Sequence, residues 1–362
     1  MNRMKFSIGG CLAIIAVMLF ACSKNNSGNN NPAASDAFKQ RMLLNYCDTL
    51  FIPGYTQFNT QVTTLDAAIT EFLNDPVQSK LDALRNPFKN TYLAFENISM
   101  PYFGPASALL LNNTLNSFPS KTADIENAII AGPGSYNFNQ PLVSDSIQGL
   151  PALDYLLFST NTLQKFQEST SANRKQYVRD IMTKIKTLAT SNLTQWNGSY
   201  RSAFTGNLQT NVGSPIGYVV NQLAYEMDAM KGPRIGWPFG KRSNGIVFAD
   251  KCEAYYSGFS GDLATANLTA LKKYFTGGTG TGIDDYLVEI NRTELKNTVL
   301  NQFDVAINAV AAIPAPLSAS FSNNAPAVEN AYREVQKLLT YLKTDVASAT
   351  AVQITYMDND GD

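Results

Sequence analysis

Apolar residues recur at intervals of three and four positions along most of the chain, with polar residues between them. This spacing places the apolar side chains on one face of an α-helix, which completes a turn about every 3.6 residues. Four long runs show the pattern: Val62, Leu65, Ile69, Phe72 and Leu73; Val178, Ile181, Ile185 and Leu188; Leu295, Val299, Phe303, Ile307 and Val310; and Val328, Tyr332, Val335, Leu339, Leu342 and Val346. Each run predicts an amphipathic helix that packs its apolar face against a core.

The alternation typical of β-strands is scarce. Its best example, residues 352–356, is too short to build a sheet, so the pattern predicts an all-α fold of packed helical bundles. Two segments rich in Gly and Pro, residues 100–105 and 231–245, interrupt the helices, and each follows a helix that carries Tyr and Glu. We interpret this as two helical-bundle domains, residues 37–200 and 201–362, with a hint of internal duplication.

Several residues predict where helices begin and end. Ser35 fits an N-cap, because its hydroxyl can accept a hydrogen bond from a backbone N–H of the first turn. Residues 75–76 and 86–87 each place Pro after Asp or Asn, and residues 277–278 are two glycines. All three pairs predict the end of a helix or a turn.

The N-terminal 36 residues differ from the rest of the chain. Residues 1–21 have basic residues followed by an apolar stretch too short to span a bilayer, as in a signal peptide. The stretch ends in Leu-Phe-Ala before Cys22, which resembles the bacterial lipobox, where the chain is cut before the Cys and the thiol is lipidated. The alternative is an ordinary signal peptide with an incidental Cys.

Residues 22–36 are polar and predict a flexible tether. If Cys22 carries lipid, the membrane is a partner of this protein through that lipid. We therefore expect an outer-membrane lipoprotein that faces the periplasm or the cell surface.

Charge and composition exclude several classes of function. Lys and Arg total 28 and Asp and Glu total 29, so the chain lacks the positive charge that nucleic-acid binding requires. It contains no His, which excludes Ser-His-Asp and Cys-His catalysis and HExxH zinc sites. Beyond residue 22 only Cys47 and Cys252 remain. They could pair in an exported protein, but we favour two buried free thiols.

Residues 148–158, Gln-Gly-Leu-Pro-Ala-Leu-Asp-Tyr-Leu-Leu-Phe, resemble the signature of the imelysin-like family, Gly-x-His-x-x-Glu followed by an apolar helix. Other stretches are similar to the family's motifs: Tyr92 and Glu96 followed by Gly104 and Pro105, residues 231–240, and residues 354–362. The family includes insulin-cleaving metallopeptidases and periplasmic iron-uptake proteins. The resemblance implies two helical bundles with a site in the crevice between them and a link to iron uptake.

The signature departs from the family at the two positions that carry its chemistry. The His position is Pro151 and the Glu position is Asp154. In the family the His and Glu lie one turn apart on one helix face, so both could reach one metal. Pro cannot ligate, and no other His can replace it. The oxygen donors that remain suit a hard cation such as iron or calcium better than zinc.

A purely structural interpretation also explains this segment. Gly149 permits a tight turn, and Pro151 fits the first position of a helix. Asp154 would lie in the first turn, where its charge interacts favourably with the helix dipole. The alternative is that Asp154 keeps a role in ligand binding.

Charged residues near the Gly/Pro segments complete the candidate site. Helix carboxylates such as Glu96 and Glu226 are usually solvated, but Glu96 could instead meet Asp154 and bind a cation or a polyhydroxyl ligand. Arg234 could bind a carboxylate or phosphate, or pair with a carboxylate of the other domain. The candidate ligand-binding residues are Glu96, Gly149, Pro151, Asp154 and Arg234, with Glu96 and Asp154 as the candidate metal ligands.

Three hypotheses follow. The first is a non-catalytic lipoprotein that binds a small ligand or a hard cation in the crevice between the domains. The second is a metallopeptidase of the insulin-cleaving type, which the loss of the motif His opposes. The third is a structural or partner-binding lipoprotein in which the crevice has lost its ligand.

Overall fold

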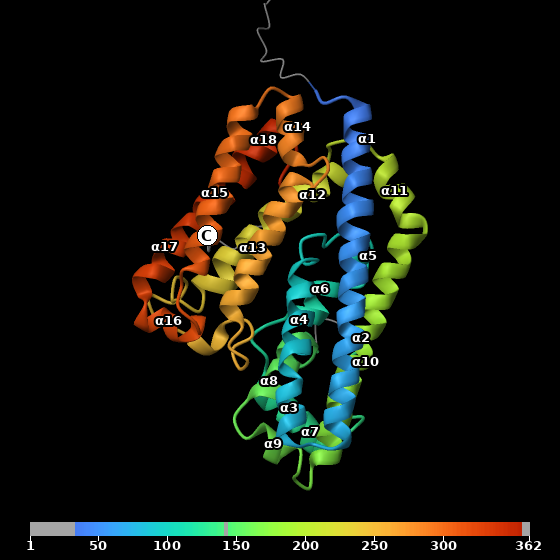
Figure 1. The fold of residues 1–362 in the computed structure, drawn as a ribbon, viewed down its shortest axis with the longest axis vertical. Helices are drawn as coiled ribbons and strands as arrows, with labels where there is room; N and C mark the ends of the chain where they lie inside the picture. The colour runs from blue at the N-terminus through green and yellow to red at the C-terminus, as the bar shows by residue number, and fades with distance from the viewer. Residues whose placement is uncertain (1–32, 141–143, 357–362) are drawn as a thin grey trace, which may run out of the picture. The chain divides into compact units, whose positions relative to one another are not determined.

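The computed structural model describes residues 33–140 and 144–356, which are helical and contain no β-strand (Figure 1). The all-α prediction is therefore confirmed. Within these residues, no helix is both long enough and apolar enough to cross a membrane. The predicted signal peptide, the predicted lipidation site Cys22 and most of the tether lie outside the described residues. So do residues 357–362, the end of the C-terminal stretch that is similar to a family motif.

Three long helices dominate the first half of the chain, where α2 packs against both α4 and α10 (Figure 1). Shorter helices and single turns connect and cover them. In chain order the helices are α1 (Asp36–Asn45), η1 (Tyr46–Phe51), α2 (Ile52–Asn74), α3 (Gln78–Ala83), α4 (Arg85–Glu96), α5 (Pro105–Ala108), α6 (Leu111–Asn116), α7 (Thr122–Ala131), η2 (Asp145–Ile147), α8 (Gly149–Phe158), α9 (Thr162–Lys165), α10 (Ser171–Gln195), η3 (Trp196–Tyr200) and α11 (Arg201–Gly206).

The second half contains another set of long helices, in which α15 packs against α13 and α17, and α12 packs against α17. Helix α13 also packs against α4, so the two halves share a core. The helices are α12 (Pro215–Ala229), η4 (Met230–Gly236), η5 (Ala249–Lys251), α13 (Ser260–Thr276), α14 (Ile283–Glu289), α15 (Thr293–Ala311), α16 (Leu317–Asn323), α17 (Ala325–Thr340), η6 (Tyr341–Val346) and α18 (Ala347–Ala349). The domain boundary near residue 200 stays a prediction.

The apolar runs in the sequence explain why these helices pack as they do. The run from Val62 to Leu73 is buried along α2, and the run from Val178 to Leu188 is buried along α10. The predicted N-cap is confirmed, because the hydroxyl of Ser35 accepts a hydrogen bond from the N–H of Phe38. Helical periodicity and capping therefore position the framework of the site.

Two predictions about where the helices are interrupted need correction. Residues 86–87 do not end a helix but lie in the first turn of α4, where proline is tolerated because the first N–H groups have no helical partner. Residues 230–236 are not a loop but a π-helical turn that continues α12, with Pro233 inside it. The predictions for residues 75–76 and 277–278 hold, because α2 and α13 end there.

Cys47 and Cys252 are free and buried, which confirms the preference for two unpaired thiols. Burial raises the pKa of each thiol to about 12, so both stay protonated at neutral pH. These cysteines therefore act as small apolar residues of the core.

Candidate functional site

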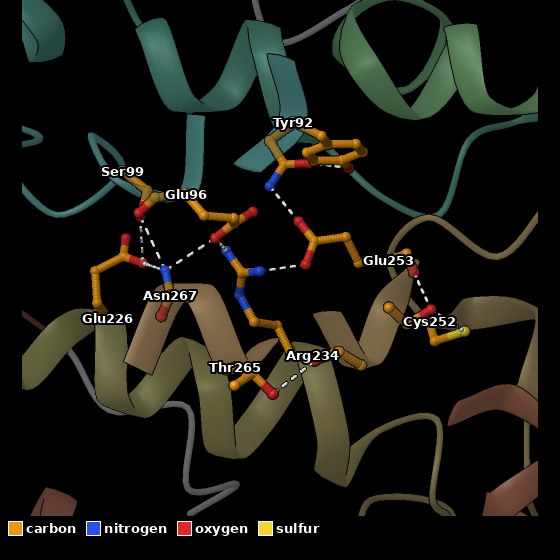
Figure 2. Close-up of polar contacts among 12 residues, drawn as sticks. Tyr92, Glu96, Ser99, Glu226, Arg234, Cys252, Glu253, Thr265 and Asn267 are labelled. Atoms are coloured by element: carbon orange, nitrogen blue, oxygen red, sulfur yellow. Dashed lines mark hydrogen bonds and ion pairs between the residues drawn. The ribbon is translucent and has the colours of Figure 1, made fainter. Parts of the chain in front are cut away.

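A buried arginine joins carboxylates from both halves of the chain (Figure 2). Arg234 lies in the π-helical turn η4, and its Nη2 is 2.9 Å from Oε2 of Glu96, the last residue of α4. Its Nη1 forms a second ion pair with Oε2 of Glu253, in the segment between η5 and α13. All three residues are at least 94% buried, so water screens these ion pairs little.

Neutral side chains complete the hydrogen bonding of the carboxylates. The amide nitrogen of Asn267, on α13, lies 3.0 Å from Oε2 of Glu96 and 3.2 Å from Oε2 of Glu226. The hydroxyl of Ser99 donates a second hydrogen bond to the same oxygen of Glu226, at 3.1 Å. Glu226 lies on α12 and is itself 3% exposed. Asn267 thus links both carboxylates to a third helix (Figure 2).

The second carboxylate oxygen of Glu253, Oε1, also accepts a hydrogen bond. The side-chain amide of Asn116, on α6, donates to Oε1 of Glu253 at 2.6 Å. The hydroxyl of Tyr92 donates in turn to the side-chain oxygen Oδ1 of Asn116. We call Glu96, Glu226, Arg234 and Glu253 the buried charge cluster. Its members come from three separate stretches of the chain, since Glu226 and Arg234 share α12 and its continuation η4, so only the complete fold assembles it.

The cluster holds more negative charge than positive charge. Burial raises the pKa of Glu96 well above its ordinary value; Arg234 opposes this rise and Glu253 adds to it. Burial also raises the pKa of Glu226. Burial alone would lower the pKa of Arg234, but the carboxylates around it raise that pKa, so the guanidinium stays charged. Arg234 is the cation on which the burial of these carboxylates depends.

The position of Glu96 gives little stability to its own helix. A carboxylate at the C-terminal end of a helix faces the negative end of the helix dipole, which is unfavourable. The π-helical turn that carries Arg234 is also a rare structure, found frequently at functional sites. The described residues contain three further π-helical segments, so the geometry of η4 does not by itself mark a site, and the cluster rests on its buried contacts.

A cavity of about 230 Å³ opens beside the cluster, between α4, α6 and α12. Glu226 and Arg234 form one wall, and the amides of α6 form another. The lining residues are Phe95, Ser99, Tyr102, Asn112, Asn113, Asn116, Ser117, Phe118, Tyr225, Glu226, Ala229, Pro233 and Arg234. The wall thus combines aromatic rings with amide, hydroxyl and carboxylate groups, as in sites that bind small ligands.

Asp154 does not join this cluster, contrary to the expectation that it meets Glu96. It is 2% exposed, and its two oxygens accept hydrogen bonds from the backbone N–H groups of Tyr256, at 2.8 Å, and Ser257, at 3.0 Å. Burial raises the pKa of Asp154 to about 6, and the hydrogen bonds oppose that rise. The carboxylate holds the turn that follows Glu253 and so supports the cluster from outside.

The rest of the signature segment forms the start of α8. Gly149 has a φ of +75°, and a Cβ there would lie 2.5 Å from the carbonyl oxygen of Thr114 on α6. Pro151 is the third residue of α8 rather than the first, a position that still lacks a helical partner for the N–H. The structural interpretation thus accounts for Gly149 and Pro151. Its expectation for Asp154 is wrong: Asp154 is the sixth residue of α8 and lies beyond the first turn, so its role is the contact with the backbone of Tyr256 and Ser257 rather than with the helix dipole.

The metal implied by the family's signature does not fit the residues at these positions. Pro151 offers no donor atom, and both oxygens of Asp154 already accept backbone hydrogen bonds. Among the described residues, no group of three or more Cys, Asp or Glu side chains is arranged to hold a metal ion. In the cluster nearby, the guanidinium of Arg234 supplies the positive charge between Glu96 and Glu253.

Sequence reasoning found Glu96 and Arg234 but missed Glu253, Asn267 and Asn116. The structure brings the first two into direct contact. It also buries both Glu96 and Glu226, which overturns the interpretation that they are solvated. The missed residues lie in no recognisable motif, and only the packing of α6 and α13 against α4 and α12 brings them to the cluster.

Comparisons with known proteins agree with this fold. A search of curated proteins finds no match. The crystal structure of a Parabacteroides distasonis protein, named as an iron-regulated protein A precursor, matches with a TM-score of 0.77 and 18% identity, covering 90% of this chain and 97% of that one. An imelysin-like protein from Psychrobacter arcticum matches with a TM-score of 0.71 and 19% identity, covering 90% of this chain and 100% of the other.

At these identities the two structures show the fold alone. The sequence itself matches the family model of imelysin, peptidase family M75, over residues 51–350. This match includes the signature segment at residues 148–158 and every member of the buried charge cluster. The chain therefore belongs to the imelysin family.

Proposed function

We propose that this protein is a non-catalytic, lipid-anchored binding protein that holds a small polar ligand in the cavity beside the buried charge cluster. One observation carries the proposal: a buried carboxylate, Glu226, lines a cavity of about 230 Å³ together with amide and aromatic side chains. This volume lies below the usual range for ligand sites, about 300–1,000 Å³, which favours a ligand no larger than about one sugar ring or one amino acid.

Binding is favoured over catalysis because the signature lacks its motif His. Pro151 and Asp154 stand where the family has His and Glu, and the chain contains no other His. A metallopeptidase needs a Lewis-acid metal and an activated water, and the donors here do not fit that role. Cleavage of a peptide substrate by the purified protein with added zinc would overturn the non-catalytic assignment.

The family points to iron acquisition as the setting. One structural relative is named as iron-regulated, and that name describes the relative alone. We propose for this chain a link to iron uptake, either by binding a hard cation directly or by binding a small molecule. Iron and calcium are the cations to include in the screen, because every polar side chain of the cavity wall presents oxygen or nitrogen and none presents sulfur.

The binding proposal can be tested by thermal unfolding and calorimetry. Sugars, polyols, amines, Fe³⁺, Ca²⁺ and Zn²⁺ should be screened, and a ligand at 100 times its Kd adds about 2.7 kcal/mol to the free energy of unfolding. Glu226→Gln should weaken binding at least about tenfold, while Glu71→Gln, at an exposed position on α2, should leave it unchanged. If no compound raises the unfolding midpoint, the third hypothesis, a protein whose crevice has lost its ligand, replaces this one.

We also propose that lipid on Cys22 anchors the protein in the outer membrane. Cys22→Ser should remove the lipid and shift most of the protein from the membrane fraction to the soluble or unprocessed fraction, since one acyl-modified residue is its only anchor under this proposal. Cell fractionation with metabolic labelling by a radioactive fatty acid measures both effects. An unchanged membrane fraction in the Cys22→Ser protein would rule out this anchor.

A further inference from the structure

The two oxygens of Glu226 have different surroundings. Oε2 accepts hydrogen bonds from the hydroxyl of Ser99 and the amide of Asn267. Oε1 has no hydrogen-bond partner among the described residues, and Figure 2 shows contacts to one oxygen only. Because Glu226 lines the cavity, this acceptor is available to a molecule bound there.

A second acceptor lines the same cavity, in the wall that α6 forms. The amide nitrogen of Asn112 donates to the carbonyl oxygen of Ser99 at 2.7 Å, which fixes the orientation of the amide. Its carbonyl oxygen is buried and has no partner in the part of the chain that the structure describes. A buried acceptor without a donor costs free energy, so the cavity favours a ligand that brings hydrogen-bond donors.

The negative charge of Glu226 indicates which kind of hydrogen-bond donor the ligand carries. Arg234 forms its ion pairs with Glu96 and Glu253, and no ion pair to Glu226 forms among the described residues. Glu226 thus faces the cavity as a buried carboxylate without a cation bonded to it. A hydroxyl group would satisfy its hydrogen bond but not its charge, whereas a positively charged donor satisfies both.

We propose that the ligand carries a primary ammonium group, which binds Oε1 of Glu226 and the carbonyl oxygen of Asn112. This inference rests on the proposed function and gives its ligand a chemical class: a small primary amine. An ammonium offers three donors and no acceptor, which matches a wall of acceptors. Tyr102 and Tyr225 also line the cavity, and aromatic faces attract cations within about 6 Å.

Other charged ligands fit less well. An anion would be repelled, because three carboxylates surround a single guanidinium in the adjoining cluster. A calcium ion takes about six to eight oxygen ligands, more than this wall of the cavity presents. A small amine needs only a few acceptors and a partly apolar surface for its carbon atoms, which the side chains of Phe95, Ala229 and Pro233 provide.

Matched pairs of compounds test the inference. Glucosamine is compared with glucose, and butylamine with butanol, by calorimetry on the full mature chain. The amine of a pair should bind at least about tenfold more tightly than its neutral partner. In Glu226→Gln, the side-chain carbonyl can keep the hydrogen bonds from Ser99 and Asn267, so the new NH₂ group faces the cavity. This variant should lose the preference for the amine, while Glu71→Gln should keep it.

If Glu226→Gln folds poorly, a second variant tests whether the compounds bind in this cavity. Ala229→Leu places a larger side chain in the cavity from a half-buried position and should weaken both members of each pair. Equal binding of amines and neutral partners would overturn the amine inference and leave the proposed function intact. If neither member of any pair binds, and the wider screen also finds no ligand, both fail.

Discussion

Arg234→Met lowers the free energy of unfolding at neutral pH by about 3–5 kcal/mol, the expected cost of breaking a buried ion pair. The substitution keeps an unbranched, flexible side chain in η4 but leaves Glu96 and Glu253 buried without the cation that contacts both. Removing one partner costs far more than the net contribution of the pair, because the remaining charges stay desolvated. Urea unfolding followed by circular dichroism measures the loss.

The loss should depend on pH in a defined direction. Arg234 lowers the pKa values of Glu96 and Glu226, so its removal raises both further above their unfolded values. A carboxyl with a raised pKa in the folded state contributes stability at low pH, and this contribution is lost as the pH rises through the folded pKa. The free energy of unfolding of Arg234→Met should therefore differ less from that of the wild type at about pH 4.5 than at neutral pH.

A matched control separates this effect from the general loss of an arginine. Arg179→Met, at an exposed position on α10, should change the free energy of unfolding by no more than about 0.5 kcal/mol at any of these pH values. A loss below about 1 kcal/mol for Arg234→Met, with no dependence on pH, would show that the guanidinium does not hold the cluster together.

The long helices were predictable because the signal for each is local. The apolar positions on α2 and α10 repeat within single turns, and they are buried as the periodicity indicated. The cluster could not be predicted in the same way. Ion pairs such as Glu96 with Arg234 join residues far apart in the chain, and a carboxylate on a helix carries no local sign of its burial.

The signature segment shows how a family pattern both helps and misleads. Pro151 and Asp154 indicated from sequence that the family's metal chemistry is changed here. The new role of Asp154, which holds the backbone of Tyr256 and Ser257, depends on a segment about a hundred residues away. The sequence therefore predicted that the signature has lost its metal ligands but not which contact the altered residue makes instead.

Gly149→Ala should destabilise the protein by about 2–5 kcal/mol, through backbone strain and overpacking together. Gly149 has a φ of +75°, which L side chains rarely adopt, and an added Cβ would lie 2.5 Å and 2.6 Å from the carbonyl oxygens of Thr114 and Leu115. Real Cβ atoms essentially never come so close to other atoms, so α8 and α6 must move apart. Thermal and urea unfolding measure the change.

Gly134→Ala provides the matched control. Gly134 also has a positive φ, of +99°, but a Cβ there would meet nothing within 4 Å. Its substitution should lower the free energy of unfolding only by the backbone strain of a positive φ, about 1–2 kcal/mol. The difference between the two variants measures the close approach of α8 to α6, and similar losses in both would show that this approach is not tight.

The same close approach should affect the cavity. Thr114 and Leu115 belong to α6, which also carries Asn112 and Asn116 into the cavity wall. If Gly149→Ala pushes α6 away from α8, these amides move relative to Glu226, and binding of a ligand should weaken even though Gly149 does not line the cavity. Calorimetry on the folded variant below its unfolding midpoint tests this, with Gly134→Ala expected to bind as the wild type does. The glycine of the family signature would then act here as a positioning residue, which holds one wall of the site through the backbone of α6.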